Sequence, residues 1–439
     1  MSTPAPRHES TLIRCGTLID GTGGPPAREV GVLVRDGRIA EVRPLGQDPP
    51  AAQVIVDATS STLTPGLVDA HTHPAWSTDT DPSEWDACRS TPEGLFSWCV
   101  AALSSAAAAG VTTVRDCGSP TGVLVEVRRA LERGTIRGPR LVVSGPCITT
   151  TAGHADFIGM TADDVADVVR TVRGLCALGV DHIKVMAAGG DMDPHTNRRM
   201  PQYSTAELQA LVAEASRLSL PVTAHATCTE AIRRSVEAGV HTLAHCNWLG
   251  AEIGTIDYSP AVAQLILDQG TYIDLDLPNS FADYAERDGE EFVRTGSPGL
   301  ARSRWQLHRE IRDRGGRIFF SSDEFGRKIG SFPALLLGAV RTGEVSVTEA
   351  IHRATAVPAG AVMPSLDIGT VSVGQVADLA LFSGDLAADP TGLIDCEASW
   401  SGGHRLQVTD ELTARTTTTR PTGRPVSPAG APHGSSERP

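Results

Sequence analysis

Lysine is scarce in this chain. Only two of the 38 basic residues are lysine, Lys184 and Lys328, and the others are arginine. Arginine can replace lysine on most surfaces, but it cannot perform lysine's nucleophilic or carbamate chemistry. Lys184 lies within the apolar run 182–186, where an unpaired ammonium group would be costly. The sequence therefore predicts a specific role for Lys184.

Several other features are missing. No stretch is apolar for long enough to cross a bilayer, and residues 1–11 lack the basic start and apolar core of a secretory signal. The nine cysteines include no C-x-x-C pair, which favours reduced thiols. A net charge of −14 argues against binding to nucleic acid or an anionic membrane through a positive field. We therefore expect a cytoplasmic protein without nucleic-acid or membrane partners.

The two ends of the chain share a β pattern. Residues 11–60 read as short strands joined by turns, with Asp36-Gly37 as a hairpin signal, and residues 374–382 return to the same character. We therefore predict a small β-sandwich domain built from residues 1–61 and 359–404. The Thr-, Pro- and Gly-rich residues 405–439 are predicted to be a disordered tail.

Residues 62–358 alternate apolar strands with amphipathic helices, which predicts an α/β fold. Eight strand–helix units in succession favour a closed, TIM-like (β/α)8 barrel. An open doubly wound sheet is the alternative, but no Gly-x-Gly-x-x-Gly turn follows the first strand. The predicted strands are Leu67–His71, Val111–Arg115, Arg140–Ser144, His182–Met186, Val222–His225, Thr242–His245, Thr271–Asp274 and Arg317–Ser321. The predicted helices include Thr161–Leu178, Thr205–Leu218 and Ala301–Arg314, the second with a capping box at Ser204-Thr-Ala-Glu207.

Residues of metal-ligand type lie at the ends of these strands. His71 and His73 are two apart on one strand, so their imidazoles point the same way and can share a metal ion. In a barrel, active sites form where strands end. Four further residues lie at such ends, namely Lys184, His225, His245 and Asp323. Any one of them alone could be a buried core residue or a helix cap, but together they predict a metal site.

At this point the sequence resembles the metal-dependent amidohydrolase superfamily. The resemblance covers nearly all of the chain up to about residue 400. It rests on Thr64-Pro-Gly-Leu-Val-Asp-Ala-His-Thr-His73, Gly110-Val-Thr-Thr-Val-Arg-Asp116, Ile183-Lys-Val185, Ala224-His-Ala226, Leu243-Ala-His245, Ser321-Ser-Asp323 and the return segment Gly369–Leu379. Two segments, Thr149–His154 and Gly179–Gly190, look most like the branch that holds Xaa-Pro dipeptidases and ochratoxin-degrading amidases.

The resemblance implies a chemistry and a ligand set. It implies two divalent metal ions, with Zn²⁺ as the default, bridged by a carbamate that CO₂ forms on Lys184. His71 and His73 would hold the more buried ion with Asp323, and His225 with His245 the more exposed one. A hydroxide bridging the ions would attack the carbonyl of an amide, with Asp323 as general base and then general acid. The implied substrate is a small molecule, peptide-like or an N-acyl amino acid.

Substrate contacts are harder to assign. His154 resembles the family's substrate-facing histidine and could stabilise the oxyanion, although a loop histidine bonded to backbone is an equal alternative. Tyr203, Arg198 and Arg199 are candidates for holding a substrate oxygen or carboxylate, with a solvated loop as the alternative. The loops 74–93, 187–203 and 276–299 are expected to shape the pocket. They contain Trp76, Trp85, Arg198, Arg199, Phe281 and Tyr284, which would suit an aromatic or carboxylate-bearing amide.

Three other functions stay open. A mononuclear deaminase of the same superfamily typically lacks the lysine of strand 4 and has a glutamate three residues after the histidine of strand 5, where this chain has Cys228. A cyclic amide or imide hydrolase would use the same ligands. A non-catalytic scaffold would have lost its metal ligands, whereas all six positions are filled here. Homo-oligomer formation is possible in each case.

Overall fold

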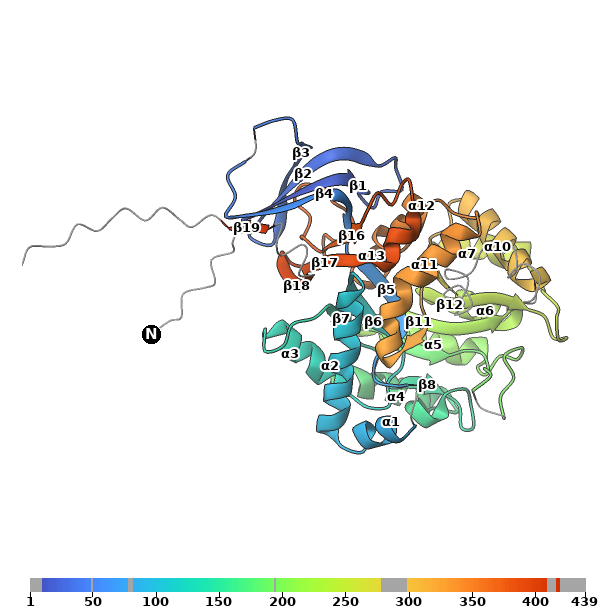
Figure 1. The fold of residues 1–439 in the computed structure, drawn as a ribbon. Helices are drawn as coiled ribbons and strands as arrows, with labels where there is room; N and C mark the ends of the chain where they lie inside the picture. The colour runs from blue at the N-terminus through green and yellow to red at the C-terminus, as the bar shows by residue number, and fades with distance from the viewer. Residues whose placement is uncertain are drawn as a thin grey trace, which may run out of the picture.

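Strands from both ends of the chain meet in one sheet, and the segment between them forms an α/β unit (Figure 1). The computed structural model describes residues 10–48, 50–77, 82–192, 195–277, 298–408 and 416–418.

The eight strands of this sheet, which we call the terminal sheet, come from the first 65 and the last described residues. They are β1 (Thr11–Leu18), β2 (Ala27–Arg35), β3 (Arg38–Pro44), β4 (Val54–Pro65), β16 (Leu379–Ser383), β17 (Cys396–Ser401), β18 (His404–Val408) and β19 (Thr416–Thr418). The strand order is β18-β17-β16-β4-β1-β2-β3, with β19 also on β4. β4 therefore joins the N-terminal strands to the C-terminal strands, since it pairs in parallel with β1 and antiparallel with β16.

Strands from the two chain ends pair with each other in the terminal sheet. Asp36 and Gly37 both have positive φ, 50° and 74°, as the predicted hairpin turn requires. Past the predicted boundary at residue 404, β18 runs on to Val408 and β19 pairs with β4. Folding of the terminal sheet into a two-layer sandwich stays a prediction, and residues 419–439 lie outside the described part of the chain.

The α/β unit contains all eight strands that the sequence predicts. They are β5 (Leu67–His73), β6 (Val111–Asp116), β7 (Arg140–Val142), β10 (Ile183–Met186), β11 (Val222–Cys228), β12 (Thr242–Leu249), β13 (Tyr272–Asp276) and β14 (Ile318–Ser321). Neighbouring strands are parallel, and they form two arcs, β5-β6-β7 and β14-β13-β12-β11-β10.

Backbone hydrogen bonds connect the ends of the two arcs. Asp181 N donates to Val143 O at 2.8 Å after β7, and Asp323 N donates to His71 O at 2.9 Å beside β5. Three short strands add to the arcs and were not predicted, namely β8 (Cys147–Thr149), β9 (Gly159–Thr161) and β15 (Glu324–Phe325). The parallel arcs, with helices between successive strands, fit a TIM-like barrel.

Helices cover the outside of these arcs (Figure 1). They are α1 (Pro82–Arg89), α2 (Pro92–Ala108), α3 (Val123–Glu132), α4 (Val165–Leu178), α5 (Thr205–Arg217), α6 (Thr229–Glu237), α7 (Pro260–Gln269), α10 (Pro298–Asp313), α11 (Phe332–Arg341), α12 (Val347–Arg353) and α13 (Ala356–Val362). The predicted capping box is present at the start of α5, where Ser204 and Glu207 bond to each other's backbone. α4 begins later than predicted because Asp164 caps it.

The terminal sheet continues directly into the barrel. β4 ends at Pro65 and β5 starts at Leu67, so Gly66 alone joins them. A Cβ atom at Gly66 would lie 2.0 Å from Oγ1 of Thr112, so only glycine fits there. The main apolar core includes Ala380 and Phe382 of β16 together with the barrel strands. The two parts therefore share packing as well as backbone.

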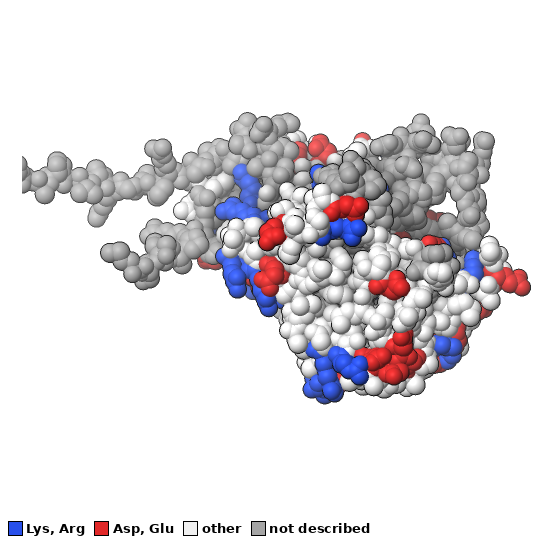
Figure 2. All heavy atoms as spheres, turned by 90° about the horizontal axis from the view of Figure 1, so that it is seen from below, with Lys and Arg blue, Asp and Glu red and all other residues white. Residues whose placement is uncertain are grey.

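On the face shown in Figure 2, basic and acidic side chains lie in small groups of both signs around a wide uncharged area. Within the described residues, no helix is both long enough and apolar enough to cross a membrane.

Candidate metal centre

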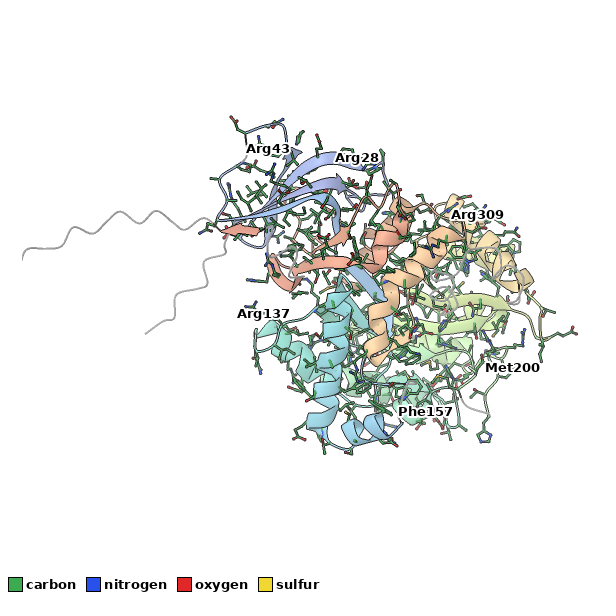
Figure 3. The ribbon with its side chains drawn as sticks, in the orientation of Figure 1. Arg28, Arg43, Arg137, Phe157, Met200 and Arg309 are labelled. Carbon is green, nitrogen blue, oxygen red and sulfur yellow. The ribbon has the colours of Figure 1, made fainter. Side chains whose placement is uncertain are left out.

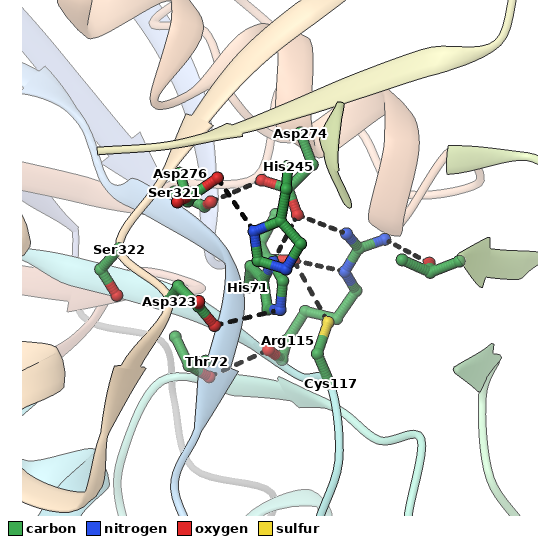
Figure 4. A network of polar contacts seen from close by, with 12 residues as sticks. His71, Thr72, Arg115, Cys117, His245, Asp274, Asp276, Ser321, Ser322 and Asp323 are labelled. Atoms are coloured by element: carbon green, nitrogen blue, oxygen red, sulfur yellow. Dashed lines mark hydrogen bonds and ion pairs between the residues drawn. The ribbon is translucent and has the colours of Figure 1, made fainter. Parts of the chain in front are cut away.

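Four histidine rings gather where the barrel strands end (Figure 4 shows two of them). His71 and His73, both on β5, have ring centroids 5.6 Å apart. The ring of His245, from β12, lies 5.1 Å from that of His71 and 4.5 Å from that of His225 on β11. The structure therefore brings together all four histidines that the sequence predicts as metal ligands.

Asp323 and Lys184 complete the cluster. Oδ1 of Asp323 lies 3.2 Å from Nε2 of His71 and 3.3 Å from Nε2 of His73. Nζ of Lys184 lies 3.0 Å from the same Nε2 of His71. Asp323 has a φ of 53°, a conformation that non-glycine residues rarely adopt and that is concentrated at functional sites. All six predicted ligand residues therefore line one cavity.

Each histidine has one ring nitrogen engaged by an oxygen outside the cluster. The contacts are Nδ1 of His71 with Asp274 at 2.9 Å, Nδ1 of His73 with Gly118 O at 3.0 Å, Nε2 of His225 with Gly189 O at 3.1 Å and Nδ1 of His245 with Asp276 at 3.0 Å. For His73, His225 and His245 this contact is a hydrogen bond that the ring nitrogen donates. The other ring nitrogen then keeps a free lone pair, which is how metal-binding histidines are oriented.

The protonation of these rings suits cation binding. Burial lowers the pKa of His71 well below its ordinary value, and the neighbouring Lys184 lowers it further. Burial likewise lowers the pKa of His225, and His245 adds to the effect. For His245 itself burial opposes protonation, but Asp276 outweighs it and raises the pKa. His71 and His225 are thus neutral at pH 7, the state in which imidazole binds a metal.

The donor set fits a divalent metal ion. Ligand atoms of His71, His245 and Asp323 all lie within 4.8 Å of one another. Imidazole nitrogen together with carboxylate oxygen is a typical ligand set for zinc and similar ions. His73, His225 and Lys184 line the same cavity.

Buried carboxylates lie near the cluster, and Figure 4 shows one of them, Asp274. Burial raises the pKa of Asp274 to about 7, although Arg115, 3.7 Å away, favours its charged form. Burial also raises the pKa of Asp69 to about 8, and this residue accepts a hydrogen bond from Ser322 N. Asp116 accepts hydrogen bonds from three backbone N–H groups, those of Gly118, Ser144 and Gly145. Asp69 and Asp116 therefore fix strand ends and loops.

The cluster forms the floor of a cavity of about 250 Å³. Trp76 and Phe325 form one wall, with ring centroids 4.8 Å apart, and Phe325 stacks on His73. Phe157 contacts Trp76 and is half exposed. Figure 3 shows Phe157 and Met200 at the end of the barrel away from the terminal sheet. The cavity therefore offers polar groups at its base and aromatic surface on one wall.

His154 lies in this cavity, as predicted. Its ring centroid is 4.6 Å from that of His225, and its Nδ1 is buried without a hydrogen-bond partner among the described residues. Burial lowers its pKa to about 4, with His245 contributing. A Cβ atom on Gly190 would lie 2.2 Å from the His154 ring, so the absence of a side chain at position 190 makes room for the histidine.

Comparison with known proteins places this site in a family. The sequence matches the amidohydrolase family over residues 62–405, which is most of the chain. The chain belongs to the amidohydrolase family.

Individual members of this family give a more detailed comparison. The chain is 31% identical to ochratoxinase of Aspergillus niger over 277 residues, which are 55% of this chain and 55% of that protein. The chain thus spans about half the length of the curated relatives that it matches.

Solved amidohydrolase structures share the fold. The crystal structure of A. niger ochratoxinase matches with a TM-score of 0.76 and 24% identity, over 92% of this chain and 97% of that chain. A Xaa-Pro dipeptidase with bound methionine in the active site gives a TM-score of 0.74 and 23% identity, over 90% and 99% of the two chains. The predicted resemblance to this branch of the amidohydrolases is confirmed.

Two of the predicted substrate contacts do not reach the cavity. Tyr203 is only 1% exposed, and its hydroxyl donates to Ala162 O at 2.9 Å. It precedes the helix cap Ser204, a position whose apolar side chain packs onto the first turn of a helix. The guanidinium of Arg199 donates to the carbonyls of Gly250 and Glu252. Tyr203 is thus a core residue, and Arg199 holds a loop.

Arg198 does line the cavity. It forms an ion pair with Asp191 at 2.6 Å, and Asp191 has 67% of its side chain exposed. Of the predicted aromatic residues, Trp76 contributes to the wall, whereas Trp85 on α1 packs on Trp98 of α2. Phe281 and Tyr284 lie outside the described residues.

Sequence reasoning missed two polar residues of the site. Asp276 orients His245, and Asn247 lines the cavity. Asp276 could have been found, since Asp274 and Asp276 alternate at the end of β13 as His71 and His73 do at the end of β5. No comparable pattern points to Asn247.

Proposed function

We propose that this protein is a metal-dependent amidohydrolase that cleaves the C–N bond of an amide in a small molecule, peptide-like or an N-acyl amino acid. The observation that carries the proposal is the convergence of His71, His73, His225, His245, Lys184 and Asp323 on one cavity. Family membership and the likeness to ochratoxinase support amide hydrolysis.

The cluster would hold two divalent ions, with Zn²⁺ as the default. When bound, such ions supply a hydroxide nucleophile at neutral pH and polarise the scissile carbonyl. His71, His73 and Asp323 would hold one ion, and His225 with His245 the other. Lys184 would bridge them as a carbamate, because an ammonium at that position would repel cations, whereas a carbamate is an anionic oxygen ligand.

The remaining residues act on protons and on the substrate. Asp323, 30% exposed to the cavity, would take the proton released as the carbonyl is attacked and deliver it to the leaving amine. His154, neutral at pH 7, would donate a hydrogen bond to the developing oxyanion. Arg198 would bind a substrate carboxylate in place of Asp191, since exposed ion pairs are weak and exchange readily.

The surroundings of β11 argue against a deaminase. Cys228, three residues after His225, precedes the first residue of α6 and is 1% exposed. The nearby Glu230 pairs with Arg233 at 2.6 Å and with Arg234 at 2.7 Å on the helix surface, and it does not line the cavity. No described residue on this strand end therefore offers the carboxylate that a deaminase would use to shuttle protons.

The deciding experiment is metal stoichiometry combined with turnover. Wild-type protein and Lys184→Ala are purified without chelator, their metal content is measured, and both are assayed on a panel of N-acyl amino acids and Xaa-Pro dipeptides. We expect close to two ions per wild-type chain, a sharp loss in Lys184→Ala, and turnover by wild type alone. One ion in both proteins would point to a mononuclear enzyme, and none in either would favour the scaffold.

A further inference from the structure

Asn247 is a polar residue of the cavity that the proposed function leaves unused. It lines the cavity and is 4% exposed. Its Oδ1 atom is buried and has no hydrogen-bond partner among the described residues. Native proteins pair nearly all buried polar atoms, because an unpaired one costs free energy. An unpaired acceptor in a substrate cavity therefore indicates a missing donor.

The strand that carries Asn247 departs from regular pairing at this residue. β11 and β12 pair Ala226 with His245 and next pair Cys228 with Leu249. One residue of β11 thus lies opposite three of β12, so β12 bulges at residues 246–248 with Asn247 in the middle. Bulges occur next to active sites because they redirect a side chain.

The backbone of this bulge is both unusual and firmly held. His245, Cys246 and Trp248 have φ angles of 68°, 46° and 54°, which non-glycine residues rarely adopt. His308 Nε2 donates to Cys246 O at 3.2 Å, and Asp257 N donates to Trp248 O at 2.8 Å. Contacts on both sides of Asn247 therefore fix the direction of its side chain. Strained backbone maintained in this way is typical of functional sites.

We propose that Asn247 binds the substrate by accepting a hydrogen bond from the N–H of its amide, and that it makes the site select amides over esters. This inference rests on the proposed hydrolase function and adds a determinant of specificity to it. The side-chain oxygen is an acceptor, so its partner must be a donor. An ester has oxygen in place of the N–H and would leave Oδ1 unpaired. Sites built around such a hydrogen bond reject analogues that lack the donor.

The test compares a matched substrate pair. The most rapidly hydrolysed N-acyl amino acid and its ester analogue, with oxygen replacing the amide nitrogen, are assayed with wild type, Asn247→Leu and Asn247→Asp. Asn247→Leu removes the acceptor at similar volume, whereas Asn247→Asp keeps an oxygen acceptor. Metal content and melting temperature are measured for each protein, which separates a lost contact from a damaged site.

We expect kcat/KM of Asn247→Leu on the amide to fall by about tenfold to a hundredfold, with little change on the ester and unchanged metal content. Asn247→Asp should retain more of the amide preference than Asn247→Leu. Equal losses on both substrates, or no loss, would overturn the proposal and leave the hydrolase function standing.

A wild type that hydrolyses neither substrate would instead refute the proposed function. Calorimetric titration of the metal-loaded protein with N-acetyl-L-phenylalaninamide then tests Asn247 independently. Weaker binding to Asn247→Leu than to wild type would support the contact. Equal binding to both proteins, or no binding to wild type, would overturn it.

Discussion

The ammonium nitrogen of Lys184 lies 3.0 Å from Nε2 of His71, and both residues are 1% exposed. The neutral imidazole can accept a hydrogen bond from the Lys184 nitrogen, but a buried ammonium group is costly unless a negative group lies beside it. Asp323 contributes one negative charge at 3.2 Å from Nε2 of His71. A carbamate on Lys184 would contribute a second negative charge. The contact between Lys184 and His71 is therefore where the proposed chemistry can be tested most directly.

Lys184→Arg should fail to assemble the two-metal centre. Arginine keeps the positive charge but cannot form a carbamate. We expect metal content well below that of wild type, as for Lys184→Ala. In addition, reconstitution of metal-free wild type should require bicarbonate in the buffer. Equal metal uptake by wild type in CO₂-depleted and bicarbonate buffers would contradict the carbamate.

Asp276→Asn should weaken metal binding without removing a ligand. Asp276 lies 3.0 Å from Nδ1 of His245 and orients that ring. Loss of such an outer partner typically costs about 10-fold to 100-fold in metal affinity. The measurement is competition with a chelator of known affinity. Asp395→Asn, on an exposed turn before β17, serves as the control and should bind metal like wild type.

Gly190→Ala should displace His154. The added Cβ would lie 2.2 Å from the imidazole ring, so the ring must move. We expect kcat to fall by about 10-fold to 100-fold, in line with loss of an oxyanion contact, at unchanged metal content. Gly174→Ala is the matched control, since a Cβ there meets nothing within 4 Å. It lies within α4, where alanine should stabilise the helix by about 0.5–1 kcal/mol. Full activity of Gly190→Ala would remove His154 from the mechanism.

Arg198→Ala should raise KM about tenfold for substrates that carry a carboxylate, because a charge-assisted hydrogen bond is worth roughly 1.5–3 kcal/mol. KM for the corresponding primary amides, which lack that charge, should hardly change. Arg199→Ala offers the comparison at the adjacent position, since Arg199 bonds to loop carbonyls instead of the cavity. A similar effect of both variants on both substrate classes would show that the loop, not the charge of Arg198, matters.

Folding stability should decrease as pH rises above 9, partly through Cys15. Burial raises the pKa of this thiol from 9.0 to about 12, and its Sγ contacts Val30 O at 3.3 Å. At pH values between these two pKa values, the Cys15 thiol is deprotonated in the unfolded chain but still protonated in the folded chain. The unfolded state is therefore favoured by up to about 1.4 kcal/mol for each pH unit.

Urea unfolding at pH 8 and pH 10 measures this effect. Cys15→Ala should show a smaller loss of unfolding free energy between the two pH values than wild type. Cys88→Ala, at a partly exposed position of α1, should match the wild-type difference. An identical pH dependence in Cys15→Ala and wild type would show that the thiol ionises normally in the folded protein.

Most of the fold could be predicted because buried parallel strands are recorded in the sequence as short apolar runs. Leu67–Val68 and Ile183–Val185 are of this kind, and both lie in predicted strands that the structure confirms. The shared direction of His71 and His73 could be predicted as well, because alternation along a strand fixes which side chains share a face. Strand position and side-chain alternation can thus be predicted from a few neighbouring residues.

What the sequence did not reveal depends on contacts between distant segments. The bulge that directs Asn247 is held by His308 and Asp257, which lie 61 and 10 residues further along the chain. The direction of Tyr203 was predictable in principle, since an apolar residue before a capping box usually packs inward. The placement of Arg199 was not, because it depends on how the loop after β12 folds back.

Gly66 limits how this protein can be divided or recombined. β4 needs β1 from the start of the chain and β16 from its end, and one residue later the same backbone becomes the strand that carries His71 and His73. Trimming either terminus would strip a partner from β4 and loosen the base of the strand that carries His71 and His73. The barrel therefore cannot be excised as a module, and grafting its loops onto another barrel would leave behind the sheet that keeps these two histidines in register.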